Sequence, residues 1–313
     1  MIPPVAHLIW YGTDFPWVNA LAIRSLLSRG ALDRVVLHHD ADLTGTRWWS
    51  DLADPRFEAW RIDAPAIFAR SGGDADALAA IYEEMPTPAS RANVLRAAIL
   101  AAEGGVYLDM DTVTVRPLPP LLATGFFCGE ERVVYPAAVA RSRSPGARLP
   151  ALGRIVARDV LRRLPGGWRT FRRIEASYPL AANNAVVGAA PCHPLVRRLL
   201  DEMVAMPREK RLVRFALGTH LLQDVLAAHA GGDLVVYPPS VFYPLAPEIS
   251  EHWFRRTRKP DLARAICAET RVVHWYASVR TRKVVPLIDP DYVKRHAARQ
   301  LFSALALPFA ERW

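Results

Sequence analysis

The chain has 313 residues and a mass of 34.8 kDa, and its 51% of hydrophobic residues are enough for one large α/β domain or two smaller ones. Its 40 basic and 31 acidic residues give a formal net charge of +9, and arginine dominates the basic set. This surplus suits an anionic substrate, nucleic acid or an acidic membrane surface. An arginine bias that is spread over the whole chain can also reflect coding composition alone.

Three cysteines, Cys128, Cys192 and Cys267, lie far apart in the sequence. Their odd number and wide spacing argue against a disulfide framework and against a zinc-ribbon motif. The first residues lack the basic and apolar regions of a secretory leader, and no uninterrupted apolar run approaches about 18 residues. We therefore expect a cytoplasmic protein that does not span a membrane and that is at most peripheral at its inner face.

The first third of the chain alternates strand and helix patterns. Buried-strand patterns lie at residues 5–11, 34–39 and 57–62, and helical patterns at 16–29, 74–84 and 89–103. The β-α-β opening favours a parallel sheet of the nucleotide-binding type.

The second half of the chain changes composition before it returns to sheet-like sequence. Residues 136–180 are rich in arginine, proline and glycine and predict an inserted helical excursion, near the acceptor side of the site and not a separate domain. Further strands are expected at 184–188, 234–237 and 272–276, and helices at 193–206 and 219–230. We divide the chain into one domain, residues 1–286, and a helical tail, residues 287–313. The tail has Phe302, Leu305 and Phe309 on one side and can dock on its own domain, a membrane or a partner.

The chemistry centres on the sequence Gly104-Gly105-Val106-Tyr107-Leu108-Asp109-Met110-Asp111. Either glycine can adopt the left-handed conformation that ends a helix. If the following strand continues through the two aspartates, their side chains point to the same side while Met110 points away. Two such carboxylates suit a hard divalent cation, Mn²⁺ or Mg²⁺, that keeps open positions for water and phosphate oxygens. A D-x-D pair alone is short and common, so its flanking residues decide its interpretation.

Those flanking residues give the resemblance. The helix before the glycines contains Ala92-Asn93-Val94-Leu95-Arg96. A helix with S-D-x-x-R, an apolar run and then G-G-x-Y-x-D-x-D is typical of a family of D-x-D glycosyltransferases. The chain thus resembles this family, which includes the Och1-type mannosyltransferases, the α-1,4-galactosyltransferases and, more distantly, the clostridial glucosylating toxins. The resemblance implies a single GT-A-type, Rossmann-like domain that binds nucleotide-sugars, with a mixed sheet.

Three further segments are similar to this family. Ile2-Pro3 and His7-Leu8-Ile9-Trp10-Tyr11-Gly12 resemble its first strand, in which the tryptophan lies against the nucleotide base. Asn183 to Gly188, followed by His193-Pro194, is similar to a segment whose asparagine faces the sugar. His274-Trp275-Tyr276-Ala277-Ser278 is similar to an ending that closes over the diphosphate and metal. The resemblance therefore makes His274 a candidate third metal ligand and Ser278 a candidate donor contact.

The resemblance also implies a metal-dependent, retaining hexosyltransferase that uses a UDP-sugar or, second, a GDP-sugar. Asp111 would bind the cation directly, and Asp109 would bind it directly or through water and reach the ribose. Arg96 lies three residues after Asn93, on one helical face, so both could reach the donor sugar or its phosphate. Tyr107 would flank the ribose or base.

No residue of the sequence can be named as a catalytic nucleophile. The leaving phosphate would take the acceptor proton on one face of the sugar, or Asn184 or Asp224 would lie beneath the anomeric carbon. We count Asp109, Asp111, Arg96 and Asn184 as the candidate catalytic residues. The acceptor would be a hydroxyl of a glycan or glycolipid, as in polysaccharide biosynthesis, and the protein could contact a membrane peripherally.

Two residues depart from the family pattern. Asn93 stands where the family usually has an aspartate. A neutral amide, which donates and accepts hydrogen bonds, therefore replaces a carboxylate, which only accepts them. The donor sugar can differ for that reason. Val279 stands at the position of the final tryptophan, which puts the closing contact, and activity itself, in question.

Two other functions fit parts of the sequence. Asp109-Met110-Asp111-Thr112-Val113 satisfies the D-x-D-x-[TV] pattern of haloacid-dehalogenase phosphatases, but it comes after about a hundred residues and no D-D or G-D-x-x-x-D pattern follows it. A non-catalytic basic protein that binds sugar, nucleic acid or a membrane would account for the charge. No recognised nucleic-acid motif is present, so nucleic acid is not an expected partner.

Overall fold

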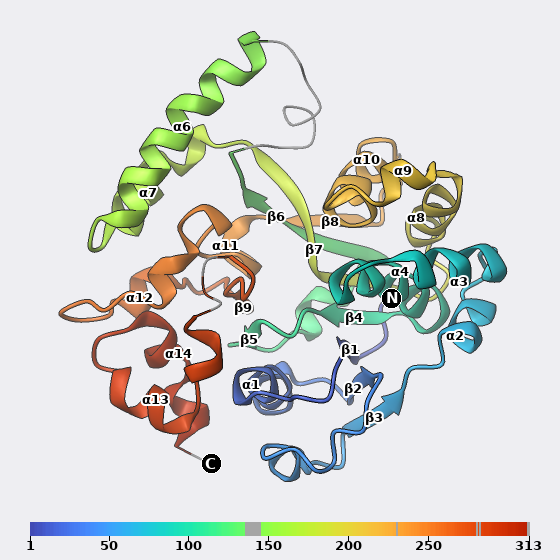
Figure 1. The fold of residues 1–313 in the computed structure, drawn as a ribbon, viewed down its shortest axis with the longest axis horizontal. Coiled ribbons are helices and arrows are strands. Elements are labelled where there is room, and N and C mark those ends of the chain that lie inside the picture. The colour runs from blue at the N-terminus through green and yellow to red at the C-terminus, as the bar shows by residue number, and fades with distance from the viewer. Residues whose placement is uncertain (135–144, 230, 280, 282, 312–313) are drawn as a thin grey trace.

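A seven-stranded mixed sheet forms the centre of the computed structural model, which describes residues 1–134, 145–229, 231–279, 281 and 283–311 (Figure 1). Its strand order is β3-β2-β1-β4-β7-β6-β8. The strands are β1 (Val5–Trp10), β2 (Arg34–His39), β3 (Phe57–Arg61), β4 (Gly105–Leu108), β6 (Phe126–Arg132), β7 (Leu180–Ala189) and β8 (Leu234–Tyr237). The predicted fold class, α/β with a mixed sheet, is confirmed.

Strand directions divide the sheet into two parts. β3, β2, β1 and β4 are parallel, whereas β7 runs antiparallel to both β4 and β6. The chain steps outward from β1 through β2 to β3 and then returns to place β4 on the other side of β1. In open parallel sheets ligands bind outside the carboxyl ends of the strands at such a reversal. The expected site is therefore at the ends of β1 and β4.

Helices cover both faces of this sheet. One apolar cluster joins α2, α3, α4, α8 and α10 to the sheet, and a second lies on the side of α1. The helices are α1 (Trp17–Ser25), α2 (Ala64–Arg70), α3 (Ala75–Glu84), α4 (Pro88–Glu103), α6 (Pro145–Arg163), α7 (Gly167–Ile174), α8 (Pro194–Ala205), α9 (Arg208–Arg211), α10 (Leu221–Ala227), α11 (Pro239–Phe242), α12 (Leu262–Ala265), α13 (Pro290–His296) and α14 (Leu301–Ala310). No helix among the described residues is both long and apolar enough to cross a bilayer.

Local sequence fixes both ends of α4, which leads into the site. At its start the side chain of Thr87 accepts a hydrogen bond from the Ser90 N–H, Ser90 bonds back to the N–H of Thr87, and proline follows Thr87. At its end Gly104 and Gly105 both have positive φ, +68° and +97°. A Cβ at Gly105 would lie 2.7 Å from Val5, so the turn into β4 needs glycine for conformation and for space.

The C-terminal tail packs on the rest of the chain. As predicted it is helical, in α13 and α14, and Phe302, Leu305 and Phe309 are all buried. They belong to a third apolar cluster that also contains Trp17 of α1 and Trp275. The tail therefore uses its apolar side for an intramolecular contact. The boundary at residue 287 stays a prediction.

The expected excursion over residues 136–180 is helical where the structure describes it. Residues 136–144 lie outside the described part of the chain, and α6 and α7 follow them. Figure 1 shows this pair at the upper left, apart from the centre of the sheet. Leu161, Trp168 and Phe171 are buried between the pair and the third cluster.

Two predicted elements are shorter than expected. The strand expected at 272–276 is β9 (Val272–His274), which pairs antiparallel with β5 (Thr112–Thr114), because Tyr276 turns into the left-handed region with φ +60°. The helix expected at 219–230 starts as a π-type turn, Ala216–His220, in which Gly218 is not helical, and continues as α10. Both deviations lie next to the site and neither has a residue signature in the sequence.

Two buried histidines connect β1 and β2. Nδ1 of His7 lies 3.1 Å from Nε2 of His38, and both side chains are almost fully buried. Burial lowers the pKa of His7 to about 3 and that of His38 to about 4. Both are neutral in the folded protein, whereas in the unfolded chain they gain protons near pH 6.5. Their contribution to stability is therefore complete above about pH 6.5 and decreases as the pH falls towards 4.

We predict that replacing His38 with Gln makes the free energy of unfolding less sensitive to acid. The free energy of unfolding of the wild-type protein should fall by about 3 kcal/mol per buried histidine between pH 6.5 and pH 4. For His38→Gln the total fall should be smaller by about 3 kcal/mol, because one of the two histidines is gone. Denaturant unfolding at several pH values measures both slopes. Values at pH 8, where both histidines are neutral in either state, control for the packing cost of the substitution. Parallel slopes for the two proteins would contradict the prediction.

Candidate metal centre

Asp109 and Asp111 occupy the turn that follows β4 at the expected edge of the sheet. The N–H of Asp109 donates to the Ala185 carbonyl of β7, 2.8 Å away, and Thr112 Oγ1 donates to the Asp109 carbonyl. Met110 points into the apolar core. The strand does not continue through the motif, so the expectation of one strand with both carboxylates on one side is wrong. The turn instead brings the carboxylates together between β4 and β5.

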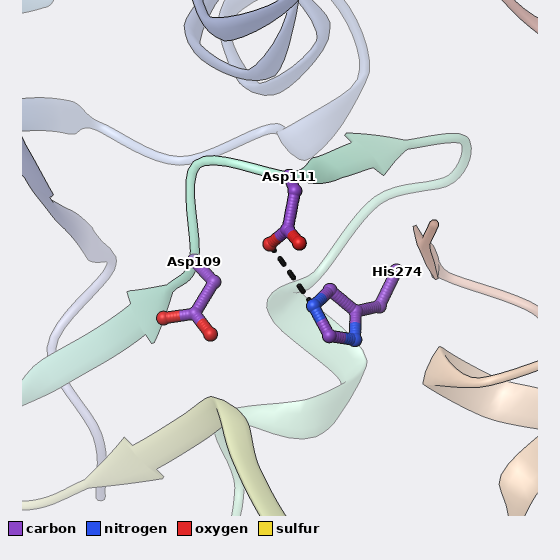
Figure 2. A group of neighbouring side chains, drawn as sticks. All are labelled: Asp109, Asp111 and His274. Carbon is purple, nitrogen blue, oxygen red and sulfur yellow. Dashed lines mark hydrogen bonds and ion pairs between the residues drawn. The ribbon is translucent and has the colours of Figure 1, made fainter. Parts of the chain in front are cut away.

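His274 approaches the same point from the last residue of β9. Its Nε2 lies 2.9 Å from Oδ1 of Asp111, and one ligand atom from each of Asp109, Asp111 and His274 lies within 4.8 Å of the others (Figure 2). The structure thus brings together the three residues predicted to bind the metal. Asp111 and His274 are 163 positions apart in the chain.

The immediate surroundings hold Asp109 on one side only. Tyr107 Oη donates a 2.8 Å hydrogen bond to Asp109 Oδ1, and Arg96 Nη1 lies 3.3 Å from the same oxygen. The Arg96 guanidinium also lies over the Tyr107 ring, 4.3 Å from its centroid, and donates to the Asn184 carbonyl. Because these contacts use Oδ1, the second carboxylate oxygen is free of them and available to a cation.

Asp111 is held by the chain that follows β9. The Ala277 N–H donates to Asp111 Oδ2 over 2.7 Å, and the Trp275 N–H donates to the Asp111 carbonyl. Thr281 Oγ1 donates to the Ala277 carbonyl over 2.6 Å and so supports this segment from behind. Asp111 is therefore held in place by backbone contacts before any ligand binds.

Burial and charge act in opposite directions on these groups. Burial raises the pKa of Asp109 above its usual value, and the attraction of Arg96 only partly offsets this. Burial would also raise the pKa of Asp111, but the His274 charge and hydrogen bond and the Ala277 N–H hold it below its usual range. Burial would lower the pKa of His274, yet Asp111 raises it above 6.5. His274 and Asp111 therefore stabilise each other's charged forms.

The donor set fits a divalent cation. Two carboxylates and one imidazole converge, and His274 Nδ1 is buried with no hydrogen-bond partner among the described residues. Carboxylate oxygens suit Mg²⁺ and Mn²⁺, and the added imidazole shifts the preference towards Mn²⁺. The three residues leave coordination positions for oxygens of a ligand on the cavity side.

A cavity of about 390 Å³ opens beside this centre. Four further residues predicted from the sequence line it, namely Asn93, Arg96, Asn184 and Ser278, as does Val279. Asn184 Nδ2 donates to Asn93 Oδ1 over 2.9 Å, so the two amides form a pair in the cavity wall. Asp224, considered as a residue beneath a sugar, lines a neighbouring groove on α8 and α10 and is not among the residues of this cavity.

Trp10 and Tyr107 are not among the described residues that line the cavity. Trp10 ends β1 on the same edge of the sheet. Its Nε1 donates to the Asp14 carbonyl, and its ring packs edge-on against Phe15. Tyr107 lies buried beneath Asp109, which it holds. The stacking of a base on Trp10 stays a prediction.

Sequence reasoning missed Glu131 and the part played by Tyr276. Glu131 on β6 is buried and lines the cavity, and its Oε2 accepts a 2.6 Å hydrogen bond from Tyr276 Oη. Burial raises the pKa of Glu131, while Tyr276 and Asn183 bond to it. The Tyr276 ring in turn packs against that of His274, with centroids 4.1 Å apart. A glutamate within a strand gives no sequence signal of this kind, so only the fold could reveal this support.

One family model matches part of the chain. Residues 46–127, about a quarter of the 313-residue chain, match the family model of the glycosyltransferase sugar-binding region containing the DXD motif. This stretch includes Asn93, Arg96, Asp109 and Asp111. No curated protein matches the chain.

Two solved structures resemble the chain weakly. One is the PaToxG glycosyltransferase, with 16% identity and a TM-score of 0.45 over 72% of this chain and 69% of that one. The other is the ligand-free glycosyltransferase domain of the YGT toxin, with 10% identity and a TM-score of 0.44 over 75% of this chain and 80% of that one.

We predict that Mn²⁺ binds more weakly as the pH falls. Below the raised pKa of His274 the cation competes with a proton, so binding should release a proton and the apparent affinity should increase with pH. Calorimetric titration with Mn²⁺ at about pH 5.5 and about pH 8 measures this. His274→Gln should bind more weakly at high pH and show a flatter dependence, and Asp111→Asn should bind poorly at both. Equal affinity of the wild-type protein at the two pH values would refute the competition.

We also predict that Tyr276 and Glu131 act as a pair. Tyr276→Phe should lower the free energy of unfolding by about 1–3 kcal/mol, because a buried carboxyl loses a hydrogen-bond donor. Glu131→Gln alone should cost a similar amount, whereas the double variant should cost less than the sum of the two. Denaturant unfolding of all four proteins gives the coupling energy. Strictly additive losses would show that the 2.6 Å contact contributes nothing.

Proposed function

We propose that this protein is a metal-dependent, retaining glycosyltransferase that moves a hexose from a nucleotide-sugar to a hydroxyl acceptor. One observation carries the proposal. In the region that matches the family's sugar-binding model, Asp109 and Asp111 converge with His274 on a cavity that Asn93 and Arg96 also line. Cation ligands, a buried arginine and amide groups in one cavity are what binding of a diphosphate and a sugar requires.

The position of the cavity orients the donor. The diphosphate lies against Asp109, Asp111 and His274, at the carboxyl edge of β1 and β4 where the order of the parallel strands reverses. The nucleoside extends towards the end of β1 and Trp10, and the hexose towards Asn93 and Asn184. UDP is the favoured nucleotide and GDP the second choice, as the resemblance to the family implies.

Each protein group then has a defined task. A divalent cation held by Asp109, Asp111 and His274 supplies positive charge that offsets the charge of the departing diphosphate. Tyr107 and Arg96 fix Asp109 through one oxygen, so the other faces the cavity. Arg96 is buried, and a buried guanidinium attracts an oxyanion more strongly than an exposed one does.

Retention of configuration is part of the proposal. The neutral amide of Asn184 is a poor nucleophile and its Nδ2 is bonded to Asn93, so we assign Asn184 to binding of the sugar. The other nearby carboxylate, Glu131, accepts a hydrogen bond from Tyr276 Oη. These contacts favour departure of the diphosphate and arrival of the acceptor on one face of the sugar, with a leaving-phosphate oxygen taking the acceptor proton.

The Asn93–Asn184 pair is the part of the site that favours an altered sugar preference. An aspartate at position 93 would accept two hydrogen bonds from sugar hydroxyls, whereas Asn93 offers one acceptor, already bonded to Asn184, and donors. The acceptor is a hydroxyl of a glycan or glycolipid.

We predict that UDP-sugars raise the melting temperature only in the presence of Mn²⁺ or Mg²⁺. A donor at about 100 times its dissociation constant should stabilise the fold by about 2.7 kcal/mol, a shift that thermal denaturation detects readily. The screen contains UDP- and GDP-hexoses with and without Mn²⁺. Release of UDP or GDP with an added glycan or glycolipid acceptor then tests turnover.

Variants and rival outcomes sharpen this screen. Asp111→Asn should lose the metal-dependent shift while its unliganded melting transition stays cooperative, and Trp10→Ala should lose part of the shift with every donor alike. Hydrolysis of an aryl phosphate with Mg²⁺ would indicate a phosphatase instead. No metal-dependent stabilisation by any nucleotide-sugar would exclude the donor site.

A further inference from the structure

An uncovered apolar stripe runs along α6. Leu149, Leu152, Val156 and Val160, here called the α6 stripe, are between 50% and 70% exposed. Their spacing of three, four and four residues places them on one face of the helix. Four neighbouring exposed aliphatic side chains on one helix are unusual for a solvated surface and mark an interaction site.

The opposite face of α6, which carries Ala151 and Leu161 as well as Arg158, points inward. Arg158 Nη1 donates to Glu248 Oε2 over 2.9 Å, and its side chain is only 16% exposed. Arg154 Nε donates to the Ser177 carbonyl over 2.8 Å. Because these contacts fix the rotation of the helix, the α6 stripe faces outward as a consequence of the fold.

The region around the stripe is strongly basic. Between residues 145 and 174 the chain has eight arginines and a single acidic residue, Asp159. Arg163 lies seven residues after Val156, hence on nearly the same helical face, and is exposed. Arg173 of α7 is also exposed. Arg158, Arg162 and Arg169 pair with carboxylates, whereas Arg163 and Arg173 have no carboxylate partner among the described residues. The surface that carries the stripe therefore combines aliphatic groups with a net positive charge.

We propose that the α6 stripe docks on an anionic lipid surface. Aliphatic side chains would enter the boundary between headgroups and acyl chains, while Arg163 and its neighbours would meet lipid phosphates and carboxylates. A second copy of this chain is a poorer occupant, since self-association would bring two basic surfaces together. The C-terminal helix, by contrast, has its apolar side buried.

The same helix lies next to the cavity. Glu248, the partner of Arg158, lines the cavity and also accepts a hydrogen bond from the Val134 N–H. Docking of α6 would therefore hold the cavity close to the lipid surface. Lipid binding does not depend on the proposed transferase activity and is measured without a nucleotide-sugar.

The test is co-sedimentation of the full chain with phosphatidylcholine vesicles, with and without phosphatidylserine. Wild-type protein should bind the anionic vesicles more tightly than the neutral ones, and added salt should weaken this binding. Leu152→Ser combined with Val156→Ser should weaken it by about tenfold or more, because two aliphatic groups no longer enter the lipid. Arg163→Glu should weaken binding to anionic vesicles only.

Leu287→Ser is the matched control, because Leu287 is 62% exposed on another segment. This variant should bind vesicles as the wild type does. Circular dichroism melting checks that all variants are folded. Failure of the wild type to bind anionic vesicles, or undiminished binding by the double variant, overturns the proposal. So does a dimer in sedimentation equilibrium that the double variant dissociates while vesicles bind neither protein, because the stripe is then an interface between copies of the chain.

Discussion

The arrangement of the site depends on positive charges that balance two carboxylates at a buried strand end. Asp109 and Asp111 lie close together, and neither can be ionised there at low cost without a partner of opposite charge. Arg96 supplies that charge to Asp109, and His274 supplies it to Asp111. Since these cations come from α4 and β9, the charge balance requires the N-terminal and C-terminal parts of the domain to meet at this point.

This requirement explains the segment around β9. The small β5-β9 sheet places His274 opposite Thr112, the residue after Asp111, and the Ala277 N–H then reaches the Asp111 carboxylate. Tyr276, which lies between His274 and Ala277 in the sequence, adopts an uncommon left-handed conformation. Its bond to Glu131 and its packing on His274 compensate for that conformation. The convergence of Asp109, Asp111 and His274 is thus present in the protein alone.

Periodicity and local signals were enough to predict most of the fold. The apolar runs of β1, β2 and β4 and the ends of α4 have direct sequence causes, such as the positive-φ glycines after α4. The converging residues Asp109, Asp111 and His274 were predicted because a resemblance supplied long-range information. The turn through Asp109 to Asp111 was not, because two strands of different sheets meet there and local alternation no longer applies. Glu131 was missed because its environment comes entirely from segments distant in sequence.

The orientation of helix α6 is another feature that the local sequence pattern does not predict. Its sequence has an apolar and a basic face, and the usual inference would bury the first and solvate the second. The fold instead buries Arg158, which pairs with Glu248, together with Ala151 and Leu161 on the inward face. The α6 stripe on the opposite face is left exposed. The rotation of α6 is thus set by polar and apolar contacts of its inward face, and one arginine-rich segment can both hold the fold together and present an apolar surface outward.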